Sequence, residues 1–61
     1  MGNKEKFLKI YANLPLGVRQ EIILVLDEYG AITWNVAFLE VQAGTKLSET
    51  ILKKLERLKI I

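Results

Sequence analysis

The sequence of 61 residues contains no cysteine, no histidine and only one proline. Without cysteine and histidine, disulfides, the usual structural zinc sites and nucleophile–histidine catalytic pairs are excluded. Ser48 therefore has no conventional base. The adjacent Asp27 and Glu28 would diverge by about 100° on a helix, so they do not form an acid–base pair. We expect no enzyme activity, no cofactor, no metal and no small-molecule substrate.

Long apolar runs are missing as well. The longest, Ile22–Leu26, has five residues, far fewer than the ~18 needed to cross a bilayer. The charged start of the chain is not followed by the apolar segment of a signal peptide. We therefore expect a cytoplasmic protein without a membrane partner.

The chain length predicts a single domain over residues 1–61. A domain of this size buries only ~60% of the surface that its unfolded chain exposes. Because 51% of the residues are apolar, more than such a chain hides within itself, we expect a homo-oligomer, most simply a dimer. The net charge of +2 is compatible with nucleic acid, with another anionic surface or with neither.

Cap and turn residues divide the first half of the chain into two predicted helices. Asn3 is placed to cap a helix from Lys4 to about Ala12. Pro15 ends this helix and suits the first position of a second one. The second helix would run to about Tyr29, with Gly30 closing its last turn. Its apolar residues recur at helical spacing over twelve residues; they are Val18, Ile22, Val25, Leu26 and Tyr29.

The second half predicts two further helices. Thr33 would cap a helix from Trp34 to about Gln42, and Thr45 or Ser48 would cap another that ends near Lys59. The last helix is amphipathic, and its apolar side consists of Leu47, Ile51, Leu52, Leu55 and Leu58. These patterns favour an all-α fold, a small domain of three to four helices with a helix-turn-helix-like second half.

An α+β fold with a β-hairpin at about residues 22–41 is the alternative. Ile22–Asp27 and Ala31–Val41 are rich in β-branched and aromatic residues, and the intervening Glu28–Gly30 could form the turn. We favour the helices because the apolar spacing extends over more residues than the ~5–6 of a usual strand.

A spaced pattern begins at Gly30 and continues to the end of the chain. It consists of Gly30–Thr33, Ala37, Phe38, Leu52, Leu55, Glu56, Ile60 and Ile61. The pattern resembles the DNA-reading core of winged-helix transcription regulators, which opens with Gly-x-Leu/Ile-Thr and closes with Leu-x-x-Leu-Glu-x-x-Gly-Leu-Ile. Lys59 stands where that family has the closing glycine, and Gln42 where it has the turn glycine. The resemblance covers about half of the chain and does not include the two-stranded wing.

The resemblance implies a transcription-regulator-like module that binds double-stranded DNA, with its last helix in the major groove. The residues that would face base edges are Thr45, Lys46, Glu49, Thr50 and Lys53. Lys54 and Arg57 would contact phosphates, which bind regardless of sequence. The alternative interpretation is that these charged side chains only solvate an amphipathic helix.

The apolar residues support a second functional hypothesis. In it the chain is a protein-interaction or homo-oligomeric assembly module whose central helices bury their apolar faces against another copy or another protein. The expected interface residues are Ile23, Leu24, Trp34 and Phe38, of which tryptophan is the type most enriched in binding hot spots.

Overall fold

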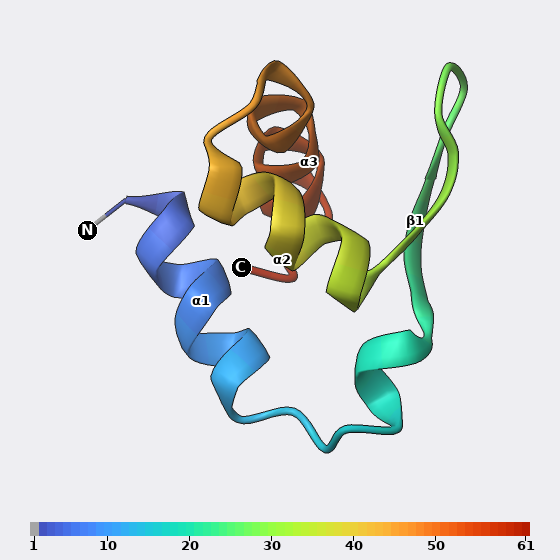
Figure 1. The fold of residues 1–61 in the computed structure, drawn as a ribbon. Helices are drawn as coiled ribbons and strands as arrows, with labels where there is room; N and C mark the ends of the chain where they lie inside the picture. The colour runs from blue at the N-terminus through green and yellow to red at the C-terminus, as the bar shows by residue number, and fades with distance from the viewer. Residues whose placement is uncertain (1) are drawn as a thin grey trace.

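The computed structural model describes residues 2–61 and contains three α-helices, one short 3-10 helix and a two-stranded sheet (Figure 1). Their order along the chain is α1 (Asn3–Ala12), η1 (Val18–Gln20), β1 (Ile22–Leu26), β2 (Gly30–Thr33), α2 (Trp34–Ala43) and α3 (Lys46–Arg57). In Figure 1 the hairpin of β1 and β2 stands to one side of the helices, and α2 lies between α1 and the hairpin. No helix within residues 2–61 is long and apolar enough to cross a membrane.

The fold is α+β, so the all-α prediction is wrong. The expected helix from Pro15 to Tyr29 is replaced by η1, strand β1 and the hairpin turn. Leu24 and Leu26 are buried, whereas Val25 between them is exposed. This two-residue alternation of burial is the pattern of a strand with one face on the core. Leu26 also fits the helical spacing of the apolar residues from Val18 to Tyr29, so the contacts with distant residues decide the outcome.

The hairpin predicted as the alternative is present, but its second strand is shorter than expected. β2 ends at Thr33, and α2 begins at the next residue. The strands are antiparallel, with Leu24 opposite Ile32 and Val25 opposite Ala31. The register shifts between Ile22 and Leu24, which marks a bulge at this point of β1.

Gly30 is left-handed as expected, although its role differs from the one predicted. Its φ angle of +79° lies at the start of β2 and closes the hairpin turn, and it does not follow a helix. Nothing lies within 4 Å of the position that a Cβ would occupy. Glycine is therefore needed here for its backbone conformation and not for lack of space.

The structure confirms the predicted caps of α2 and α3 but not the predicted cap of α1. Thr33 caps α2 as expected, because its Oγ1 accepts a hydrogen bond from the backbone N–H of Val36 at 3.1 Å. Thr45 rather than Ser48 caps α3. The prediction for α1 is wrong, because Gly2 occupies the cap position and Asn3 is already helical.

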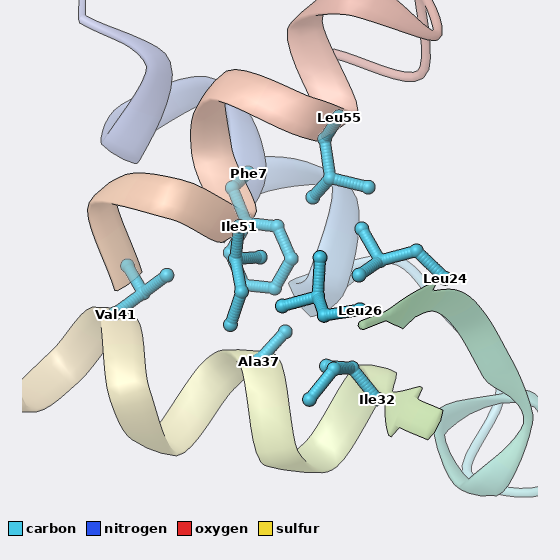
Figure 2. Close-up of a cluster of buried hydrophobic side chains, with 8 residues drawn as sticks. All are labelled: Phe7, Leu24, Leu26, Ile32, Ala37, Val41, Ile51 and Leu55. Carbon is cyan, nitrogen blue, oxygen red and sulfur yellow. The ribbon is translucent and has the colours of Figure 1, made fainter. Parts of the chain in front are cut away.

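The core joins all three helices to one face of the hairpin (Figure 2). Its buried side chains are Phe7, Leu24, Leu26, Ile32, Ala37, Val41, Ile51 and Leu55. Figure 2 shows Leu26 and Ile32 of the hairpin pointing toward Ala37 of α2, with Ile51 and Leu55 of α3 beside them. The hairpin thus covers helical side chains that would otherwise face water.

Aromatic rings hold α1 against α2. The rings of Tyr11 and Phe38 are stacked with their centroids 4.2 Å apart, and Phe7 stacks on Trp34 at 5.8 Å. The Tyr11 hydroxyl also donates a hydrogen bond to Asn35 Oδ1 at 2.6 Å. The guanidinium of Arg19 lies 4.5 Å from the centre of the Tyr11 ring, which attaches η1 to the same cluster.

The end of α3 contains a strained lysine. Lys59 has a φ angle of +59° and is the one non-glycine residue with positive φ among residues 2–61. The N–H of Lys59 donates to Glu56 O at 3.0 Å, and that of Ile60 donates to Leu55 O at 2.9 Å. These two bonds form a Schellman motif, whose left-handed position is usually glycine. The winged-helix pattern also has glycine at this position.

We therefore predict that Lys59→Gly stabilises the domain by about 0.5–1 kcal/mol, because it relieves the left-handed strain while keeping both hydrogen bonds. The matched control is Lys53→Gly, in the exposed middle of α3, which should destabilise by about 1 kcal/mol. Urea unfolding at an unchanged m-value measures both. Destabilisation by Lys59→Gly would contradict the assigned conformation.

Candidate nucleic-acid interface

A short turn joins α2 to α3 and fixes their relative position. Gly44 adopts a left-handed φ of +65°, and its N–H donates to Glu40 O at 2.9 Å. The N–H of Thr45 donates to the same carbonyl at 3.4 Å. Together with the bond from the Gly44 N–H to Val41 O at 3.2 Å, this forms a second Schellman motif, so α2 and α3 end in the same way.

Side chains reinforce the turn. The Thr45 hydroxyl donates to the Glu40 carboxylate at 2.6 Å, and the same oxygen accepts from the backbone N–H of Ser48 at 3.1 Å. Ser48 is buried and its hydroxyl donates back to the Thr45 carbonyl. Thr45 was predicted to face a base edge. The structure instead places its hydroxyl within this hydrogen-bonded turn.

The other six predicted contact residues are all exposed along α3. They are Lys46, Glu49, Thr50, Lys53, Lys54 and Arg57. The opposite side of the helix is buried through Ser48, Ile51 and Leu55. Residues three, four and seven positions apart share a helix face, so the exposed residues form a continuous surface. We call Lys46, Lys53, Lys54 and Arg57 the basic ridge.

The basic ridge contains four of the nine basic residues of the chain. An open depression on this surface is lined by Thr50, Lys53, Lys54, Glu56 and Arg57. Its walls come from side chains of one helix, so it does not enclose a ligand. Among the residues that line it, Glu56 is acidic, and Glu49 lies seven positions before Glu56 on the same helix.

The hairpin turn lies beside α3, a neighbour that the sequence did not predict. A second depression is lined by Leu26, Asp27, Glu28, Tyr29 and Thr50. Two exposed carboxylates of the turn, from Asp27 and Glu28, are therefore close to the surface that carries the basic ridge. This proximity did not follow from the predicted helix over residues 15–29, because that helix would contain Asp27 and Glu28.

The four predicted interface residues all pack within the chain. Leu24 belongs to the core with 6% of its surface exposed, and Ile23, Trp34 and Phe38 pack partly buried against that core. Other large apolar side chains are the exposed ones. Those exposed over more than half of their surface are Leu16, Ile22, Val25, Tyr29, Leu39 and Leu58.

The acidic residues do not form a metal site in the part of the chain that the structure describes. Within residues 2–61, no three acidic side chains come together as possible ligands.

Comparison of the chain with protein-family models, with curated proteins and with solved structures finds no match. The winged-helix resemblance therefore stays a prediction.

The contrast between Thr45 and Thr50 provides a test of the site. We predict that Thr45→Ala destabilises the domain by about 1–2 kcal/mol, because it removes the cap of α3 and the bond to Glu40. Thr50→Ala makes the same chemical change at an exposed position and should alter stability by less than about 0.5 kcal/mol. Thermal and urea unfolding of both variants measure the difference, and equal effects would disprove the capping role.

Proposed function

We propose that the protein binds double-stranded DNA through the exposed face of α3. The observation that carries this proposal is the concentration of positive charge on that face. Residues 45–61 contain five basic and two acidic residues, a net charge of +3, so the remainder of the chain has a net charge of −1. A basic face on an otherwise slightly acidic chain favours a polyanionic partner.

The α2–turn–α3 segment supports this proposal by its rigidity. Hydrogen bonds among Glu40, Gly44, Thr45 and Ser48 hold α3 against α2. The helix that carries the basic ridge therefore does not need to become ordered when DNA binds. In this proposal, side chains toward the beginning of α3, such as Lys46 and Thr50, face base edges. Lys54 and Arg57 extend the contact to phosphates, which supply most of the affinity.

The expected signature is a strong dependence of duplex affinity on salt. We predict that Lys53→Ala combined with Arg57→Ala weakens binding about 10-fold or more at low salt. It should also reduce the slope of log K against log salt by about 2, because two phosphate contacts are lost. Fluorescence anisotropy with a labelled random-sequence duplex measures both quantities.

The matched control is Lys4→Ala with Lys9→Ala on α1, which removes the same charge from exposed positions outside α3. We expect this pair to change affinity less than 3-fold, as a general charge effect. The proposal fails when the wild-type chain does not bind duplex at tens of micromolar and low salt. It also fails when the two pairs of substitutions have equal effects.

Homo-oligomeric assembly is a second candidate, supported by the apolar side of the hairpin that faces away from the core. Ile22 and Val25 are exposed there. A two-stranded sheet is only marginally stable by itself, so it would gain stability from further strands. Within residues 2–61 the sheet has only β1 and β2, so each strand has an edge that a second copy could extend. Pairing of two hairpins along the free edge of β1 would supply the missing strand neighbour and bring the exposed Ile22 and Val25 side chains of the two copies next to each other, so that each shields part of the other from water.

Two lysine substitutions test this candidate. Val25 on β1 and Leu39 on α2 have nearly equal exposure, 65% and 64%. We predict that Val25→Lys abolishes a dimer observed by sedimentation velocity, whereas Leu39→Lys leaves it intact. The reason is that only Val25 lies on the proposed hairpin surface. A wild-type chain that is a folded monomer at high micromolar concentration would contradict the assembly candidate.

A further inference from the structure

The basic ridge has acidic residues on both of its sides. On one side, Glu49 and Glu56 are seven positions apart and so share a flank of α3. On the other side, the hairpin places Asp27 and Glu28 in the depression that it forms with Thr50. In Figure 1 the hairpin turn rises beside α3. The ridge is therefore a narrow band of positive charge between two negative borders.

The carboxylates of Asp27 and Glu28, which form the acidic border on the hairpin side, repel phosphate. Charges interact over a Debye length of about 8 Å at physiological salt. A phosphate that approaches α3 from the hairpin side meets Asp27 and Glu28 before it reaches the lysines. A recognition helix in a major groove has a phosphate backbone on each side, so at least one backbone would pass close to this border.

Such repulsion has a use in recognition. Specificity is a difference between affinities, and a protein can raise it by disfavouring the wrong partner as well as by favouring the right one. Nonspecific binding depends almost entirely on phosphate contacts. Acidic residues beside the ridge would therefore weaken nonspecific binding, while the proposed base contacts at the beginning of α3 would be retained.

We propose that Asp27 and Glu28 are specificity-determining residues that suppress nonspecific binding of duplex DNA to the basic ridge. This inference rests on the proposed DNA-binding function. It assigns a role to the hairpin turn, which otherwise contributes little to the fold, since Asp27, Glu28 and Tyr29 are all exposed.

The test is to neutralise the border without changing its shape. Asp27→Asn with Glu28→Gln should tighten binding to a random-sequence duplex about 3- to 10-fold at low salt, because two charges that repel phosphate are removed. The gain should shrink toward 1-fold as salt is raised, since screening weakens the repulsion. Fluorescence anisotropy over a range of salt concentrations measures it, and circular dichroism confirms that the variant is folded.

The matched control is Glu5→Gln with Glu21→Gln, which makes the same change of net charge at exposed positions on α1 and before β1. We expect it to tighten binding less than 2-fold. If the hairpin variant and the control gain equally, the border has no local role and the inference is overturned while the proposed function stands. If neither the wild-type chain nor any variant binds duplex, both the function and the inference are overturned.

A single substitution guards against effects of the turn itself. Glu28→Gln leaves Asp27 in place and should give a smaller gain than the double variant in the same assay. If the double variant binds more tightly at high salt as well as at low salt, and Glu28→Gln alone has no effect, the cause is a change in turn structure at Asp27. That result would also overturn the inference.

Discussion

The fold depends on the packing of one face of the hairpin against α2 and α3. Leu24, Leu26 and Ile32 supply that face, and they meet Ala37, Ile51 and Leu55 in the core. A two-stranded sheet has little stability alone, and three short helices leave their apolar sides open without it. Each part therefore stabilises the other, and burial of about 1.5–3 kcal/mol per large apolar side chain is the dominant favourable contribution. In a chain without disulfides, this packing also fixes where the hairpin turn lies.

The same packing creates the charge arrangement of the candidate site. With the buried side of α3 held by Ile51 and Leu55, its other side must carry the exposed basic residues. With Leu26 held in the core, the next residues, Asp27 and Glu28, must emerge beside α3. The acidic border and the basic ridge are thus two consequences of one apolar contact. Both the proposed binding of duplex DNA and the proposed suppression of nonspecific binding depend on electrostatics that the core imposes.

Local sequence signals predicted the second half of the fold well. Thr33, Gly44 and Thr45 are residues whose caps and turns are encoded within a few positions, and α3 has one clear amphipathic period. The exposed position of Lys46, Lys53, Lys54 and Arg57 followed from that period.

The first half was mispredicted because the residues from Val18 to Tyr29 satisfy both helical and strand spacing. Only their contacts with α2 and α3, distant in sequence, favour the strand. The acidic border was missed for the same reason, and the capping role of Thr45 depends on its bond to Glu40 across the turn.

The most direct test of this account is a nuclear Overhauser experiment on the backbone of residues 18–33. The hairpin register predicts cross-strand contacts between Val25 and Ala31 and between Leu24 and Ile32. It also predicts strong sequential Hα–HN contacts along β1, as in any extended strand. Continuous HN–HN contacts from Val18 to Tyr29, without cross-strand contacts, would show a helix there. That result would exclude both the hairpin and the acidic border, and it would contradict the claim that the fold depends on packing of the hairpin against α2 and α3.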